Sequence, residues 1–178
     1  MKNFEITSVE NNKKYWISRA VAVCAILVVY DNEEIPHILI NKRGPGTPDY
    51  QGCWNIPCGY LDWDESTSEA CTREILEECK VYINKENWSQ FGEIEDSPSN
   101  NNQNVTVRKI AIIDFDSYLY GLSTASKMNE TEGGEINEVD DIMLMPLSNI
   151  EIESKKWAFN HKALLYEIKN KLEEYEYN

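Results

Sequence analysis

The sequence predicts an α/β or α+β fold, because segments with strand character flank two segments with helix character. The strongest strand signal runs from Arg19 to Tyr30, an apolar and partly β-branched stretch that is typical of a buried strand. One helix is predicted to begin after Ser66, and an amphipathic helix is predicted over Asn160 to Tyr175. A chain of 178 residues without repeats or a dividing linker is long enough for one core, so we predict a single domain over residues 1–178.

The remaining elements are predicted from β-branched runs and from clusters of turn residues. A turn at Asp31 to Glu34 separates the first long strand from the next. The predicted strands are one short strand within residues 1–18, then His37–Lys42, Trp54–Ile56, Trp88–Glu95, Val105–Asp114 and Ile142–Met145. The polar tract Ser97–Asn104 and the Ser-, Gly- and Glu-rich residues 121–137 are predicted to be long loops.

The helix after Ser66 has a readable beginning and a readable buried face. Ser66 and Glu69 form an S-x-x-E capping box, in which each side chain satisfies a backbone N–H group of the other residue. Cys71, Ile75 and Cys79 recur every four residues and predict a narrow apolar stripe that faces the core.

Three carboxylates gather on the neighbouring face of this helix. Glu74, Glu77 and Glu78 are three and four residues apart or adjacent, so they lie on one side. Like charges at such spacings destabilise a helix by about 0.2–0.5 kcal/mol per pair, and a cation between them removes that cost. Mg²⁺ prefers oxygen ligands, so the cluster predicts a metal site for phosphate chemistry. The alternative is a solvated acidic surface, which is common on helices.

The stretch from residue 59 to residue 81 resembles the Nudix box, Gly-x5-Glu-x7-Arg-Glu-U-x-Glu-Glu-x-Gly-U with U aliphatic. The preceding segment, Trp54 to Gly59, resembles the Trp-x-Leu-Pro-Gly-Gly of that family, with Cys58 in place of a glycine. Lys80 stands where the box has its second glycine. The matching positions are Gly59, Glu65, Arg73, Glu74, Ile75, Glu77, Glu78 and Val81.

The resemblance implies a Nudix-like fold, a mixed β-sheet sandwiched between helices. It also implies hydrolysis of a nucleoside diphosphate linked to another moiety, with Mg²⁺ or Mn²⁺ as cofactor and water attacking phosphorus. The substrate stays open among nucleotide sugars, ADP-ribose, dinucleoside polyphosphates and nucleoside triphosphates. The alternatives are a catalytically inactive nucleotide-binding or sensing module, and a diphosphate isomerase on the same scaffold.

Carried over position by position, the resemblance assigns the site. Glu74 and Glu78 are the expected main metal ligands, Glu77 binds another metal directly or through water, and the Gly59 carbonyl completes the coordination. Arg73 is expected to pair with Glu65, which then has a structural role.

The general base is either a glutamate of the box or a carboxylate of a later loop. Four acidic residues precede or begin the strand at Ile142, and we favour Glu138 among Glu135, Glu138, Asp140 and Asp141. The alternative for each of them is a solvated loop charge.

Other side chains are candidates for substrate contacts. Cations are suited to phosphate, and aromatic rings can stack on a base. The phosphate candidates are Lys42, Arg43 and Arg108, and the aromatic candidates are Trp54, Tyr60 and Trp63. Each is also compatible with an ordinary surface charge or a core aromatic residue.

The composition restricts the partners. A net charge of −14 argues against bulk nucleic acid, whereas a small polyphosphate can bind if metal ions neutralise it. The absence of a secretory signal and of a long apolar run predicts a cytoplasmic protein without a membrane span. Five cysteines and two histidines without close spacing disfavour disulfides and zinc. A homodimer remains open.

Overall fold

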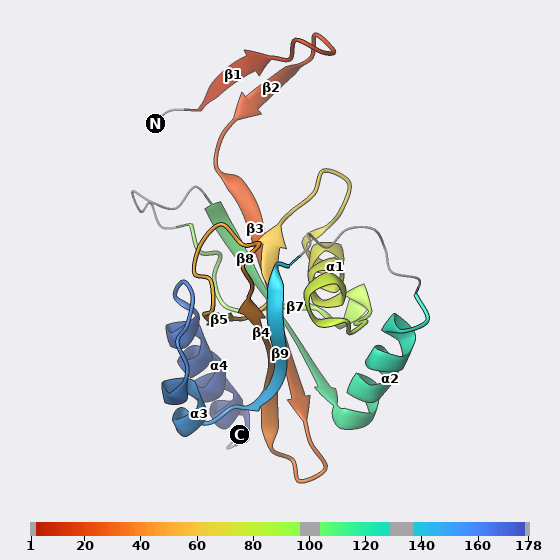
Figure 1. Ribbon diagram of the computed structural model, residues 1–178, viewed down its shortest axis with the longest axis vertical. Helices are drawn as coiled ribbons and strands as arrows, with labels where there is room; N and C mark the ends of the chain where they lie inside the picture. The colour runs from red at the N-terminus through yellow and green to blue at the C-terminus, as the bar shows by residue number, and fades with distance from the viewer. Residues whose placement is uncertain (1–2, 97–103, 129–136, 177–178) are drawn as a thin grey trace.

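A mixed β-sheet with helices on both of its faces forms the body of the protein (Figure 1). The computed structural model describes residues 3–96, 104–128 and 137–176. Within these ranges the strands of the main sheet are β3 (Ala20–Tyr30), β4 (Pro36–Arg43), β5 (Trp54–Asn55), β6 (Cys58–Tyr60), β7 (Ser89–Gln90), β8 (Asn104–Asp114) and β9 (Val139–Pro146). The helices are α1 (Thr67–Cys79), the 3-10 helix η1 (Lys85–Asn87), α2 (Phe115–Ala125), α3 (Asn149–Ser154) and α4 (His161–Glu176).

Strand β3 lies at the centre of the sheet, between β4 and β8, and both of its faces are buried. It pairs in parallel with β8 and antiparallel with β4 and β6. Val23 and Leu27 pack against residues of α1, whereas Cys24 and Ile26 pack against residues of α4. Successive side chains of a strand point to opposite faces, so a continuous apolar run fits a strand covered on both sides. The buried strand predicted from the sequence is confirmed.

The helices form two layers, α1 with α2 on one face of the sheet and α3 with α4 on the other (Figure 1). Ile75 of α1 and Leu165 of α4 are both fully buried against the sheet. This arrangement confirms the predicted mixed sheet between helices. None of the helices in the described ranges is long and apolar enough to cross a membrane.

Strand β9 places Glu138, the residue directly before it, next to the end of β4. It pairs antiparallel with β4, and the backbone N–H of Gly44 donates to the carbonyl of Glu138 at 2.6 Å. A Cβ atom at Gly44 would lie 2.2 Å from the carbonyl oxygen of Asn137, so only glycine allows this approach. The chain around Glu138 is therefore fixed next to the end of β4.

Helix α1 begins as predicted and ends at a strained position. The Ser66 side chain accepts from the Glu69 N–H while Glu69 accepts from the Ser66 N–H, which is the capping box. Lys80 forms the C-cap with φ 57° and ψ 37°, in the left-handed region that glycine enters most easily. Lys80 therefore departs from the box at a position whose backbone conformation favours glycine.

Replacing Lys80 by glycine is expected to raise the free energy of unfolding by about 0.5–1 kcal/mol, because the left-handed strain is relieved and part of the gain is lost to unfolded-chain entropy. Urea denaturation measures this change. Lys80→Ala is the control, since it removes the same charge and keeps the strain. Equal stabilities of the two variants would contradict the explanation.

The structure corrects the prediction that residues 121–137 form a long loop. Helix α2 reaches into this segment, and residues 129–136 lie outside the described part of the chain. The Asp114 side chain caps α2, and Tyr118 and Leu122 pack on the core with the spacing of one helix face. A composition rich in Ser and Gly concealed this periodicity.

Three further differences are local. Residues 1–18 hold a hairpin of two strands, β1 (Phe4–Thr7) and β2 (Lys14–Ile17), rather than one strand. The predicted strand Trp88–Glu95 contains the two-residue β7 and an isolated bridge at Glu95. Helix α3 was not predicted, and residues 97–103 of the predicted polar loop lie outside the described ranges.

Candidate active site

Arg73 is the centre of a network that joins the loop before α1 to the helix. Its guanidinium donates to Glu65 at 2.7 and 3.1 Å and to the Tyr60 carbonyl at 3.0 Å. Its Nη1 atom donates to Glu74 at 2.7 Å and to Glu77 at 3.1 Å. Although partial burial acts in the opposite direction, the hydrogen bonds from Arg73 lower the pKa of Glu65. The structure thus brings Glu65 and Arg73 together.

The carboxylate of Glu74 is buried directly against the backbone of Gly59. Glu74 is only 7% exposed, and a Cβ atom at Gly59 would lie 2.1 Å from its Oε1. Gly59 is fixed in β6 opposite Val23 of β3. Burial, opposed by the charge of Arg73, raises the pKa of Glu74 to about 7. The Glu74 carboxyl group therefore titrates near neutral pH.

Gly59→Ala is expected to lower the free energy of unfolding by about 1–3 kcal/mol, because the new methyl group occupies space that the Glu74 carboxylate fills. Chemical denaturation measures the loss. The double variant Gly59→Ala/Glu74→Ala should recover part of it, since the two changes share one contact. Strictly additive losses would show that the clash is not the cause.

Glu78 lies one turn after Glu74 and is held through one oxygen. Its Oε2 accepts from the Cys58 N–H at 3.3 Å and from Asn41 Nδ2 at 3.2 Å. Burial first, and then the charge of Glu74, raise the pKa of Glu78 to about 8, with a smaller contribution from Glu138. We did not expect Asn41 from the sequence. The available signal was a single amide directly after the apolar run Ile38–Ile40.

The carboxylates of α1 meet Glu138 in one cleft of about 280 Å³. The walls come from the second half of α1, from its C-cap and from the start of β9. The lining residues are Glu74, Glu77, Glu78, Lys80, Asn137, Glu138, Val139 and Ile142. The structure therefore brings together the three box glutamates and the favoured candidate for the general base.

The other candidates for the general base lie elsewhere. Asp140 pairs with Lys42 at 2.7 Å, and Asp141 accepts from the N–H of Ile142. Neither lines the cleft. Glu135 lies outside the described residues.

A larger groove of about 400 Å³ runs along the outer side of α1, past Arg73 and Tyr82. Its charged groups are already engaged, since Lys85 pairs with Glu69 at 2.7 Å. Because the carboxylates with raised pKa values, Glu74 and Glu78, line the smaller cleft, that cleft is the candidate site.

The cations expected to contact phosphate are held by acidic residues. Lys42 is paired with Asp140, and the buried Arg43 donates to Asp49 at 2.7 Å and stacks on Phe159 at 5.0 Å. The charge of Arg43 acts to lower the pKa of Glu78, but the effect of burial is larger and the pKa is raised. Arg108 pairs with acidic residues at 2.6 and 3.2 Å, away from the cleft lining. Phosphate contacts by these residues stay predictions.

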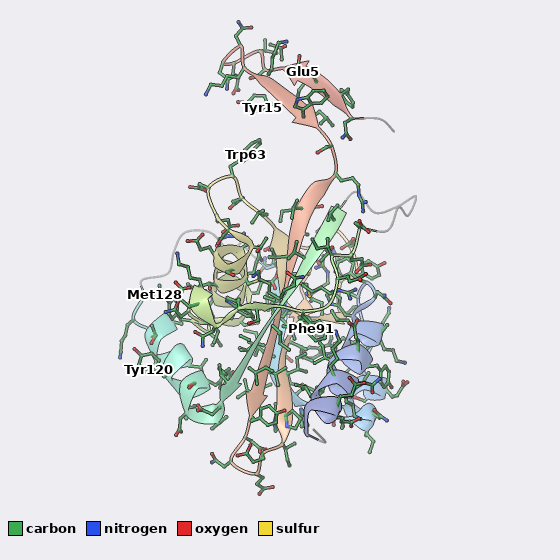
Figure 2. The ribbon with its side chains drawn as sticks, turned by 180° about the vertical axis from the view of Figure 1, so that it is seen from behind. Glu5, Tyr15, Trp63, Phe91, Tyr120 and Met128 are labelled. Carbon is green, nitrogen blue, oxygen red and sulfur yellow. The ribbon has the colours of Figure 1, made fainter. Side chains whose placement is uncertain are left out.

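The aromatic candidates differ in exposure. Trp54 is half-buried and packs against the core cluster on the α4 side. Tyr60 is exposed, and its hydroxyl donates to Asn104 at 3.1 Å. Trp63 is almost fully exposed and points toward Tyr15 of the hairpin, with ring centroids 6.2 Å apart (Figure 2). Tyr60 and Trp63 are thus exposed to solvent, and their contact with a ligand stays a prediction.

The acidic side chains have the right chemistry for a divalent cation, and they have spare oxygens. Arg73 engages Oε1 of Glu74 and Oε2 of Glu77, and two donors engage Oε2 of Glu78. In each case one carboxylate oxygen has no hydrogen bond to the described residues. In those ranges no three acidic, His or Cys side chains are already close enough to hold a metal ion. A cation that took three of these side chains as ligands would therefore have to draw them together.

Comparison with known proteins identifies the family. A family model for the NUDIX domain matches residues 18–167. The chain belongs to the Nudix family. The match includes the box, α1 and the start of β9, and thus every wall of the cleft. No curated protein matches the chain. The single domain and the homodimer stay predictions.

Solved structures confirm the Nudix fold at low sequence identity. The NUDIX domain of Shewanella oneidensis NrtR, complexed with ADP ribose, is 21% identical with a TM-score of 0.64, over 88% of this chain and 90% of that one. A MutT/nudix family protein from Enterococcus faecalis is 18% identical with a TM-score of 0.62, over 90% of this chain and 64% of that one.

A bifunctional NMN adenylyltransferase/ADP ribose pyrophosphatase from Francisella tularensis, complexed with AMP and a Mn ion, also shares the fold. It is 19% identical with a TM-score of 0.54, over 85% of this chain and 42% of that one. This chain therefore spans less than half of that protein and under two thirds of the Enterococcus protein.

Proposed function

We propose that this Nudix protein is a metal-dependent hydrolase that cleaves the diphosphate linkage of a nucleoside diphosphate derivative. The observation that carries the proposal is the cleft in which four carboxylates meet, Glu74, Glu77, Glu78 and Glu138. Glu74 and Glu78 have raised pKa values in this cleft, and such shifts are concentrated at functional sites.

Mg²⁺ or Mn²⁺ fits this donor set. Hard divalent ions take carboxylate and carbonyl oxygens, and the charge of Glu74 that raises the pKa of Glu78 is one that a cation would neutralise. The expected ligands are the spare oxygens of Glu74, Glu77 and Glu78 together with the Gly59 carbonyl. When bound, the ion stabilises charge on the phosphates and lowers the pKa of a coordinated water.

The chain itself supplies positioning and proton transfer. Arg73 orients Glu74 and Glu77 through one nitrogen, and Glu65 holds Arg73 in place. Glu138 is the proposed general base, which takes a proton from the water that attacks phosphorus. Its backbone is fixed by the Gly44 N–H, so its side chain starts from a rigid edge of the sheet.

ADP-ribose is the substrate that we would test first. Support comes from the ADP ribose complex of the NrtR domain and from the ADP ribose pyrophosphatase named among the similar structures. Nucleotide sugars, dinucleoside polyphosphates and nucleoside triphosphates present the same diphosphate to the box, so they complete the panel.

The proposal is tested by incubating the full chain with each substrate of the panel and Mg²⁺ or Mn²⁺, and by following the products by chromatography. We expect cleavage of at least one substrate, and we expect EDTA to abolish it. Cleavage that continues in EDTA would refute the metal mechanism.

A nucleotide-binding module without activity is the second candidate. It is favoured by the ion pairs of Arg73 with Glu74 and Glu77, because a metal ion would have to share these carboxylates with Arg73. In that case ADP-ribose would bind in calorimetry while no substrate of the panel is cleaved.

A further inference from the structure

Asn41 is a buried amide directly behind the cleft. It lies in β4, where its ladder partners are Asn55 of β5 on one side and Ile142 of β9 on the other. Its side chain is 1% exposed, and Nδ2 donates to Oε2 of Glu78 at 3.2 Å. Its Oδ1 is buried without a hydrogen-bond partner among the described residues. The amide nitrogen thus donates to Glu78, and the amide oxygen has no hydrogen bond to the described residues.

Asn55 gives a comparison within the same sheet. It is also fully buried, and its Oδ1 also has no hydrogen-bond partner among the described residues. Its Nδ2, however, donates to the Ile56 carbonyl at 2.9 Å and approaches Cys58 Sγ at 3.8 Å, and it makes no hydrogen bond to Glu78. Both amides are therefore buried, but Asn41 donates to Glu78 whereas Asn55 donates to the Ile56 carbonyl.

Stability alone does not account for an amide at position 41. A buried polar atom without a partner destabilises the folded state, and an apolar side chain of similar shape avoids that cost. The preceding residues of the strand, Ile38, Leu39 and Ile40, are all apolar and fully buried. A residue that breaks such a pattern at a cost to folding is expected at a functional site.

We propose that Asn41 is a positioning residue for Glu78, which holds one carboxylate oxygen so that the other faces the cleft and the metal ion. The proposal rests on the proposed function. The Cys58 N–H binds the same oxygen at 3.3 Å, so the two donors fix the carboxylate from two strands. Hydrogen bonds of this kind orient metal ligands, and their loss typically weakens metal binding by about 10- to 100-fold.

The test compares Asn41→Leu with Asn55→Leu. Binding of Mn²⁺ is measured from the electron paramagnetic resonance signal of the free ion, and Tm is measured by calorimetry in EDTA. We expect Asn41→Leu to bind Mn²⁺ about 10- to 100-fold more weakly than the wild type, with a Tm that is unchanged or higher. Asn55→Leu should bind Mn²⁺ within about twofold of the wild type, because its amide does not touch Glu78.

Unchanged Mn²⁺ affinity in Asn41→Leu would overturn the inference, and so would equal losses in the two variants. If the leucine does not fit, Asn41→Ala removes the same hydrogen bond without overpacking, and the same expectations apply. A wild-type protein that binds no Mn²⁺ would refute the proposed function itself, and this inference with it. Binding by the wild type with no effect at Asn41 would refute the inference alone.

Discussion

Glu78→Gln is expected to lower kcat/KM for metal-dependent cleavage by about 10²- to 10³-fold. Glutamine has the shape of the carboxylate and can still accept from Asn41 and the Cys58 N–H. It cannot supply the negative charge that a divalent ion needs. Steady-state kinetics on the best substrate of the panel, at saturating Mg²⁺, measures the loss.

The matched control is Glu93→Gln, which makes the same chemical change on an exposed residue away from the cleft. It should leave kcat/KM within about twofold of the wild type. A full rate in Glu78→Gln, with metal dependence intact, would exclude Glu78 as a ligand. Calorimetry at neutral pH shows whether the variant is folded.

The parts of the fold that were predicted are those whose pattern is local. The apolar run of β3 and the capping box of α1 each lie within one stretch of chain, and both appear in the structure with bounds within a residue of those expected. Helix α2 was missed because its apolar face is short and its last residues, Gly121 to Ala125, include Gly, Ser and Thr, which are weak helix formers. The hairpin before β3 was missed because its exposed strands show no buried face.

The same distinction explains the site. Glu74, Glu77 and Glu78 are on one helix, so their spacing alone places them together. Asn41 reaches Glu78 from β4, and this contact depends on how the helix packs across the sheet. The cation candidates were chosen by residue type, and type does not reveal partners. Arg108, for example, is held by two carboxylates on another side of the sheet.

Without metal, the protein is expected to lose stability as the pH rises from 6.5 to 8. In the folded state the pKa of Glu74 is about 7 and that of Glu78 about 8, against an ordinary value of 4.5. At the start of this window the unfolded chain has already released both protons, whereas the folded protein releases them as the pH rises through it. The free energy of unfolding therefore falls with pH, by about 2 kcal/mol in total, or about 5 °C in Tm.

The lower limit of this window is set by His161, which acts in the opposite direction. Burial lowers its pKa to about 3 in the folded protein, and its Nδ1 accepts from the Ile56 N–H. The unfolded histidine titrates at about 6.5, so stability lost through His161 appears only as the pH falls below that value. Above it, the two glutamates dominate the slope.

Saturating Mg²⁺ is expected to flatten or reverse this slope, because the ion binds the deprotonated carboxylates of the folded state and binds more tightly as the pH rises. Calorimetry at pH 6.5, 7.25 and 8, with EDTA or with Mg²⁺, measures both curves. Glu78→Gln should reduce the slope in EDTA, since one of the two titrating groups is gone. A Tm in EDTA that rises between pH 6.5 and 8 would show that the folded protein holds neither proton. In that event the raised pKa values would no longer support the choice of this cleft as the functional site.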